Sequence, residues 1–483
     1  MRRKINPWWW ALGTILALRL LGMAWLPLAG TSEPRYAEVA RLMALRGDWI
    51  TPWFTPEQPF WGKPPLSFWT EAIAFNLLGV TEFAARLPSW LATVGSLGLL
   101  WVYARTFFGE RIARGALLIY ASCALVFIVS GAVITDPFLA LATTWAMVAL
   151  AMAAKTPGPA WRYGFFVALA LGLLAKGPLM LVLVAGPMLP LFILYPSIRA
   201  SVKQLPWVSG TALMLLLSLP WYLLAEQKTP GFLNYFLVGE HFLRFIDSGW
   251  SGDLYGVAHK RIKGAIWGDV LVASFPWGFV ALVLLLRQIF NPQQRAALWQ
   301  TRRDPERAYL LAWALFTPVF FSLSGNILWT YVLPALAPFS ILLALGLAPV
   351  AARHALAARL LGALTGLVPL AFTVYVVLGV VDPLRLKTEK HLVAYAMQRM
   401  QPGDQLLYLD KVPFSATFYS RGQAGAVMRQ DLSQVNGSGT NWYLALPKSE
   451  LDNVSSILNR PLHPLFESSE FVLTEVPAQV TRP

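Results

Sequence analysis

The sequence predicts a mainly α-helical membrane protein: a polytopic bundle of about eleven transmembrane helices followed by a small C-terminal α/β domain. Three observations predict this fold class. Hydrophobic residues make up 56% of the 483 residues and charged residues only 13%, whereas a soluble domain carries about 25% charged residues. Apolar runs of roughly membrane-spanning length recur as far as Val381. Beyond it, polar runs and turns separate short apolar strands.

The first apolar run covers residues 7–28 and follows the basic residues Arg2, Arg3 and Lys4. Because it lacks a small-residue cleavage site, we interpret it as an uncleaved span that begins in the cytoplasm. The later runs predict further spans. They cover residues 84–103, 113–133, 137–153, 162–175, 178–195, 206–225, 267–286, 309–323, 331–348 and 358–381.

The apolar segment 66–80 decides the topology. As a helix it would reach about 22 Å, short of the ~30 Å hydrocarbon core, and it contains Glu71. If this segment does not span, the basic residues of the later short loops face the cytoplasm, as the positive-inside rule requires. We therefore predict an interfacial helix. The same rule explains the net charge of +14 better than nucleic-acid binding does.

This topology predicts a transmembrane domain at residues 1–381 and an α/β domain at residues 382–483 on the opposite side from the cytoplasm. The outward side carries a first outer loop, 30–85, and a long outer loop, 226–266. The C-terminal domain contains no nucleophile motif or glycine-rich phosphate loop, which favours an accessory or docking role. Its predicted strands cover 405–409, 425–428, 442–446 and 471–474, and its predicted helices 389–400 and 448–458.

The first outer loop is a long polar stretch in a chain that is otherwise apolar, and such loops are usually functional. Pro34 favours the first turn of a helix capped by Ser32 or Glu33, and Gly47 would end that helix. Glu33 and Arg35 would then lie at its start, close to the mouth of the bundle. Its apolar face, placed on the membrane, would consist of Tyr36, Val39, Ala40 and Met43. Further along, Lys63 is held between an aromatic residue and two prolines.

Two ionisable residues stand between spans. Asp136 precedes Pro137, and an acid at a membrane boundary indicates function by default. A helix N-cap is the equally weighted alternative. Lys176 separates two spans, and the alternative there is a lysine that snorkels to the interface.

The long outer loop carries further candidates: Glu240, His241, Arg244, Lys260 and Arg261. One Glu-His pair is weak evidence for a metal, because zinc takes three or four ligands. We therefore assign no cofactor, and a divalent metal stays open as an alternative.

Together these outer residues combine carboxylates, Glu33 and Asp136, with several cations. This set suits a reaction in which a carboxylate deprotonates a hydroxyl while arginine and lysine stabilise a departing phosphate. A phosphate linked to a lipid would explain why the site lies at membrane depth. The cations are Arg35, Lys63, Lys176, Arg244, Lys260 and Arg261.

At these residues the chain resembles the C-type membrane glycosyltransferases related to bacterial aminoarabinose transferase and to protein O-mannosyltransferases. The matching motifs span about residues 30–345, and their order and spacing carry the resemblance more than any one of them. They include Glu33-Pro34-Arg35-Tyr36, Gly47-Asp48-Trp49, Lys63-Pro64-Pro65, Arg86-Leu87-Pro88-Ser89, Thr135-Asp136-Pro137, Ala175-Lys176-Gly177-Pro178, Glu240-His241-Phe242 and Tyr331-Val332-Leu333-Pro334.

The resemblance implies an inverting transfer of a sugar from a polyprenyl-phosphate donor to a lipid, glycan or protein at the periplasmic face of a bacterial inner membrane. We assign Glu33 as the base with Asp136 assisting. The donor phosphate would be held by Arg35, Tyr36, Lys63, Lys176, Arg244, Lys260 and Arg261. Glu240 and His241 are only weak metal candidates.

The chain departs from the family pattern at three places. Ser32 stands where the family usually has its catalytic Asp, Gly62 where it has a Glu, and Ile327 where it has a Lys. Two other functions therefore stay open: a transporter or flippase of lipid-linked sugars, and a catalytically weakened subunit that binds a partner. The absence of an internal repeat argues against the transporter, and Ser32 is the best support for the weakened subunit.

Overall fold

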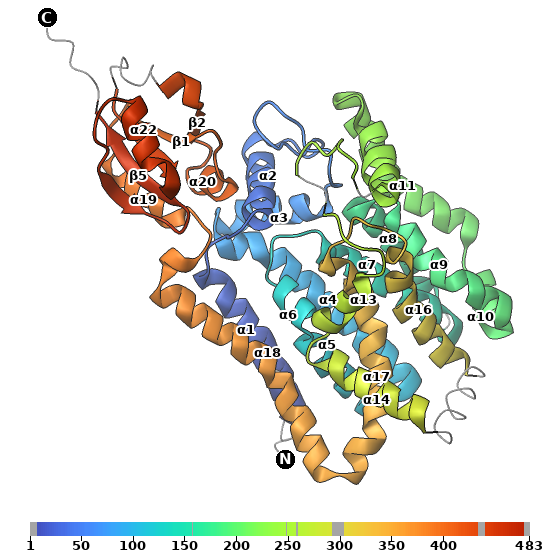
Figure 1. Cartoon of the computed structure of the whole chain (residues 1–483). Coiled ribbons are helices and arrows are strands. Elements are labelled where there is room, and N and C mark those ends of the chain that lie inside the picture. The colour runs from blue at the N-terminus through green and yellow to red at the C-terminus, as the bar shows by residue number, and fades with distance from the viewer. Residues whose placement is uncertain are drawn as a thin grey trace, which may run out of the picture.

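The structure is a computed structural model that describes residues 7–156, 158–247, 249–256, 259–291, 304–432 and 440–477. Some of the basic residues that predict the orientation, at 1–6 and 292–303, lie outside the described residues. The described chain is mostly helical and ends in a small sheet domain (Figure 1). The predicted fold class is confirmed at this level.

Helices of the bundle follow the predicted apolar runs closely. They are α1 (Pro7–Trp25), α4 (Glu82–Phe108), α5 (Glu110–Ser122), α6 (Ala124–Val129), α7 (Asp136–Lys155), α8 (Pro159–Lys176), α9 (Leu179–Leu194), α10 (Pro196–Lys203), α11 (Trp207–Lys228), α13 (Ile266–Ala273), α14 (Trp277–Phe290), α16 (Pro305–Phe321), α17 (Leu333–Arg353) and α18 (Ala355–Val381). Among the described helices, five are long and apolar enough to cross a membrane, or six if the bent pair α13–α14 is one span. The predicted count of about eleven spans is therefore not confirmed.

Two predicted spans are broken. The run 113–133 divides at Cys123 into α5 and the short α6, and the run 267–286 divides into α13 and α14, whose axes differ by 112°. Pro276 lies at the second break. Proline cannot donate the next helical hydrogen bond and disfavours helical geometry in the residue before it.

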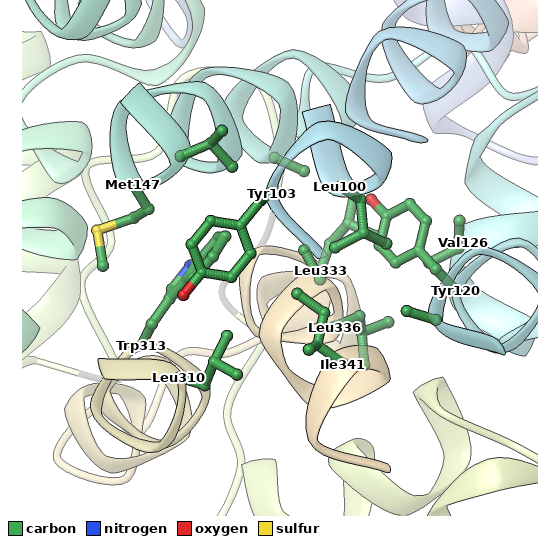
Figure 2. Packing of buried hydrophobic residues seen from close by; sticks show 14 of the residues in the cluster. Leu100, Tyr103, Tyr120, Val126, Met147, Leu310, Trp313, Leu333, Leu336 and Ile341 are labelled. Carbon is green, nitrogen blue, oxygen red and sulfur yellow. The ribbon is translucent and has the colours of Figure 1, made fainter. Parts of the chain in front are cut away.

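The core of the bundle lies where α4, α5, α7, α16 and α17 meet (Figure 2). Tyr103 and Trp313 are almost fully buried there, and the hydroxyl of Tyr309 donates to the Met147 carbonyl at 2.6 Å. In a membrane, close packing and hydrogen bonds hold helices together, because lipid tails are as apolar as the side chains. Small residues allow this close approach: α7 buries Ala142, Ala146 and Ala149 among others, and α8 buries Ala168 and Ala170.

The C-terminal domain is a five-stranded sheet in the order β2-β1-β3-β5-β4. β1 is parallel to β2 and β3, and β5 is antiparallel to β3 and β4. Successive β1 residues face opposite sides of the sheet, so α22 covers one face while α19 and α20 cover the other. The sequence did not predict β4 or α20. The elements are α19 (Lys390–Arg399), β1 (Gln405–Leu409), α20 (Phe414–Tyr419), β2 (Gly425–Val427), β3 (Trp442–Pro447), α22 (Leu451–Ile457), β4 (Pro464–Glu467) and β5 (Phe471–Val476).

The first outer loop forms α2 (Ser32–Arg46) and α3 (Leu66–Leu78), and Gly47 ends α2 in the left-handed conformation as predicted. The predicted cap is wrong, because Thr31 is the N-cap residue and makes no side-chain cap hydrogen bond. Glu38 and Arg41 are buried, form an ion pair at 2.7 Å, and lie beside Gly422 of the C-terminal domain.

The C-terminal domain is attached to the bundle by specific contacts. The Leu28 amide donates to the Tyr419 hydroxyl at 2.7 Å, and the Thr388 hydroxyl donates to the Leu28 carbonyl at 2.9 Å. Lys390 forms an ion pair with Glu82 at 2.6 Å. These contacts hold the domain beside the first outer loop, where α20 packs against α2 (Figure 1).

Candidate active site

A cavity of about 540 Å³ lies between the start of α2, the Lys63 segment, the starts of α7 and α9, the long loop after α11, the segment between α16 and α17, and the C-terminal domain. Its wall combines ionisable groups with the apolar side chains of Leu179, Val182, Phe320 and Leu328. Eight of the predicted site residues line it. They are Arg35, Tyr36, Lys63, Asp136, Lys176, Glu240, His241 and Arg244.

Asp136 and Lys176 meet because one begins α7 and the other ends the adjacent α8. The Lys176 ammonium lies 2.7 Å from an Asp136 carboxylate oxygen and 4.8 Å from the centre of the Tyr331 ring. Thr135 occupies the N-cap position, so the Asp136 side chain forms this ion pair and does not cap the helix. Gly177 follows with a positive φ of 69°, which favours glycine, and a Cβ there would lie 2.7 Å from the Phe236 ring.

A second group of charges is built on η1 (Asn234–Leu243), a π-helix in the long outer loop. Glu240 accepts from Lys63 at 3.2 Å and from Arg244 at 2.9 Å, and Arg244 also reaches Asp253 at 3.2 Å. Burial would raise the pKa of Glu240, but Lys63 and Arg244 outweigh it and hold that pKa below its usual value. Glu240 is therefore ionised at neutral pH.

The cavity has an excess of positive charge. Three carboxylates line it, those of Asp136, Glu240 and Asp253, against five cationic side chains. These are Arg35, Lys63, Lys176, Arg244 and Lys411. Cations focused in a partly enclosed cleft attract anions, and arginine and lysine are the usual partners of phosphate.

The side chains of His241 and Glu240 both have protein partners. The two ring nitrogens of His241 lie 2.8 Å from the Phe236 carbonyl and 3.0 Å from the Lys176 carbonyl. The Glu240 carboxylate forms ion pairs with Lys63 and Arg244. Burial lowers the pKa of His241. Within the described part of the chain, no group of three or more potential metal ligands converges.

Glu33, the expected base, lies behind the wall of the cavity. Its two carboxylate oxygens accept from Arg86 at 2.9 and 2.7 Å, and one also accepts from the Val133 amide at 3.2 Å. Burial would raise the pKa of Glu33, but Arg86 outweighs it and the pKa lies below its usual value. Ser32, one residue earlier, does line the cavity.

Lys260 and Arg261, expected to bind phosphate, are not among the described residues that line the cavity. Lys260 pairs through its backbone with Asn326, and the Arg261 amide donates to Gly325 at 2.8 Å. This backbone pairing holds the segment in place, and the Arg261 guanidinium forms an ion pair with Asp269 at 2.6 Å.

Sequence reasoning missed several residues of the cavity, among them Asp253, Asn326, Lys411 and Phe414. Asp253 follows Ser251-Gly252, and this segment has the composition of an ordinary solvated loop. Lys411 and Phe414 belong to the C-terminal domain and reach the cavity only because that domain docks on α2. No local pattern in the sequence marks any of them.

The chain is similar in sequence to known proteins. The family model for dolichyl-phosphate-mannose-protein mannosyltransferase matches residues 62–223. An undecaprenyl phosphate-alpha-4-amino-4-deoxy-L-arabinose arabinosyl transferase of Yersinia pestis is 33% identical over 331 residues, which are 67% of this chain and 55% of that protein. The corresponding transferase 1 of Sodalis glossinidius is 33% identical over 71% of this chain and 59% of its own length. The chain thus spans less than two thirds of these relatives.

Solved structures show the same fold. ArnT from Cupriavidus metallidurans bound to undecaprenyl phosphate superimposes with a TM-score of 0.78 at 18% identity, covering 99% of this chain and all of that one. The archaeal oligosaccharyltransferase AglB from Archaeoglobus fulgidus gives 0.54 at 12% identity, covering 95% and 69%. The fold is therefore that of the C-type membrane glycosyltransferases. Within that class, the chain is related to the bacterial aminoarabinose transferases and the protein mannosyltransferases, as its motifs predicted.

Proposed function

We propose that this chain is an inverting glycosyltransferase of a bacterial inner membrane. It moves a sugar from a polyprenyl-phosphate donor to a lipid, glycan or protein acceptor at the periplasmic face. The N-terminus would be cytoplasmic, and the C-terminal domain would be periplasmic. The relationship to undecaprenyl-phosphate aminoarabinose transferases supports the donor class.

One observation carries the proposal: the ion pair of Asp136 and Lys176 lines a cavity with two excess positive charges and a partly apolar wall. A carboxylate, a group of cations and an apolar surface are what a lipid-linked phosphate donor requires. The remaining carboxylates of the cavity, Glu240 and Asp253, are each held by Arg244. Glu33 lies behind the wall of the cavity with both carboxylate oxygens bound by Arg86, so Asp136 is the better candidate for the base.

In the proposed reaction, Asp136 accepts the proton of an acceptor hydroxyl as its oxygen attacks the anomeric carbon of the donor sugar. The bond from that carbon to the phosphate oxygen breaks, and the polyprenyl phosphate leaves with the electron pair. Lys176 and its neighbours Lys63 and Arg244 stabilise the charge that develops on the phosphate. A phosphate that draws Lys176 away would free the Asp136 carboxylate for the proton.

The direct test uses the full-length protein in detergent with a sugar linked to undecaprenyl phosphate and a membrane-lipid or glycan extract as acceptor. We expect transfer with inversion at the anomeric carbon, seen by NMR of the product, and no transfer from a nucleotide sugar. Transport of intact donor across vesicles without cleavage would instead identify a flippase. Absence of both would leave the chain as a partner-binding subunit and would contradict the proposal.

Asn326 is expected to determine the recognition of the sugar. Its side chain is only 6% exposed and lines the cavity. The side-chain oxygen of Asn326 accepts from the backbone amide of His259 at 3.2 Å. Because a backbone amide can only donate, this bond fixes which end of the side chain is the oxygen, and the NH₂ group faces away from it. That NH₂ group has no protein partner among the described residues. A buried donor without a partner is costly, and a ligand oxygen would satisfy it.

Asn326→Asp keeps an acceptor for His259 and removes the free donor. We expect the KM for the sugar donor to rise about tenfold, the value of one good hydrogen bond, with a smaller change in kcat. A donor analogue without the recognised hydroxyl should abolish the difference between variant and wild type. An unchanged KM at an unchanged melting temperature would show that Asn326 does not contact the donor.

A further inference from the structure

Two of the five cations in the cavity differ from the others. Lys63, Lys176 and Arg244 each form an ion pair with a carboxylate. Arg35 and Lys411 make no ion pair with any carboxylate that the structure describes. The excess positive charge of the cavity thus belongs to these two residues.

Both unpaired cations contact one aromatic ring. The Arg35 guanidinium carbon lies 5.8 Å and the Lys411 ammonium 5.6 Å from the centre of the Phe414 ring. Such distances are within the range of cation–π attraction. Phe414 is held in turn by Phe54 of the first outer loop, whose ring centre is 5.7 Å away. Both unpaired cations therefore lie beside the same ring.

Arg35 is prearranged and still has capacity to bind. One terminal nitrogen of its guanidinium donates to the Tyr255 carbonyl at 2.7 Å, and the group stacks 4.9 Å from the Tyr36 ring centre. Its Nε is buried and has no hydrogen-bond partner among the described residues. Asp253, the nearby carboxylate on the long outer loop, forms an ion pair with Arg244. An oxyanion beside Arg35 would satisfy the free donor and the uncompensated charge together.

The seam between the domains holds Lys411 in place. Lys411 lies between β1 and α20, and α20 packs on α2, the helix that carries Arg35. The ion pair of Lys390 with Glu82, and the hydrogen bond from Tyr419 to the same carboxylate at 3.0 Å, fix this docking. A ligand bridging Arg35 and Lys411 would therefore contact both domains.

We propose that Arg35, Lys411 and Phe414 form an oxyanion subsite at the seam between α2 and the C-terminal domain, separate from the paired cations around Asp136 and Glu240. Its ligand is a phosphate or carboxylate group on one of the two substrates. The C-terminal domain is then part of the substrate site. This inference rests on the proposed glycosyl transfer, whose donor is anionic and whose acceptor is unidentified.

The kinetic test compares Lys411→Gln with Lys411→Arg in the full-length protein. Lys411→Gln should raise the KM for one substrate about tenfold, as expected for a charge-assisted contact, with kcat and melting temperature nearly unchanged. Lys411→Arg should retain most of the affinity. Lys448→Gln is the matched control, because Lys448 is an exposed lysine of the same domain that pairs with Glu467 outside the cavity. The substrate whose KM rises, donor or acceptor, is the one that carries the bound anion.

A second measurement does not depend on turnover. Lys411 is acylated with an amine reagent and quantified by mass spectrometry in the presence of undecaprenyl phosphate, of a phosphate-bearing glycolipid, or of the same glycolipid after dephosphorylation. Protection by an anionic probe but not by the dephosphorylated glycolipid supports the subsite even if the proposed transfer reaction fails. If no probe protects Lys411 and Lys411→Gln behaves like Lys448→Gln, the subsite does not exist.

Discussion

Replacing Asp136 with Asn should lower the kcat of sugar transfer by about 10²- to 10⁴-fold, the usual contribution of a general base. The substitution keeps the shape of the side chain and its position at the start of α7, and it removes the group that accepts the proton. The KM for the donor should change little or fall, because Lys176 loses its carboxylate partner at 2.7 Å and becomes free to bind phosphate. Single-turnover assays in detergent, with donor and acceptor varied separately, measure both quantities.

The control for this prediction is Asp247→Asn. Asp247 lies in the long outer loop, is exposed, and its side chain accepts from the Gly249 amide at 2.8 Å. It is not among the described residues lining the cavity, so its replacement should leave kcat and KM unchanged. Asp136→Asn should also melt close to wild type. Full turnover by a well-folded Asp136→Asn protein would exclude Asp136 as the base.

Much of the helical fold was predictable because it depends on local composition. Apolar runs define where helices form in a membrane, and Gly47 ends α2 as a residue that tolerates the left-handed conformation. The cavity cation Lys176 was also identified, since it separates two predicted spans, and Lys63 and Arg244 were identified as charged residues of the two predicted outer loops. These inferences need no knowledge of distant contacts.

The features that the sequence did not reveal all concern distant pairing. Glu33 lies 53 residues from Arg86 in the chain, and no spacing rule indicates that a guanidinium within α4 takes both of its oxygens. Arg261 turns to Asp269 because of a backbone bridge to a segment more than sixty residues away. Lys411 and Phe414 join the cavity through the docking of a domain whose sequence carries no catalytic motif. Such arrangements depend on tertiary contacts that a single sequence does not encode in its local pattern.

Replacing Glu33 with Gln should mainly destabilise the protein, by about 3 kcal/mol, as expected when one partner of a buried ion pair is removed. The side chain of Arg86 is only 5% exposed, and it holds the chain together at the end of α1 by donating to the carbonyls of Met23, Leu26 and Pro27. Without Glu33, its buried charge would be left with these carbonyls alone. Thermal unfolding in detergent, followed by the loss of monodisperse protein, measures the effect.

The pH dependence of this contribution has a definite sign. The pKa of Glu33 in the folded protein lies below its usual value, with Arg86 outweighing the effect of burial. The ion pair therefore stabilises the fold at all pH values above the usual carboxyl pKa of about 4.3, and its contribution is lost as the pH falls below that value. The difference in stability between wild type and Glu33→Gln should be constant near neutral pH and shrink in acid.

A double replacement separates this structural role from catalysis. Glu33→Gln together with Arg86→Met removes both charges, and we expect it to regain part of the lost stability, because replacing a buried pair by apolar groups is often nearly neutral. The gain should be incomplete, since Arg86→Met also releases the carbonyls at the end of α1. If Glu33 acts only through Arg86, surviving folded Glu33→Gln protein keeps a kcat within a few-fold of wild type, whereas Asp136→Asn does not. A stable Glu33→Gln protein with kcat reduced by about 10²-fold or more would instead identify Glu33 as the base.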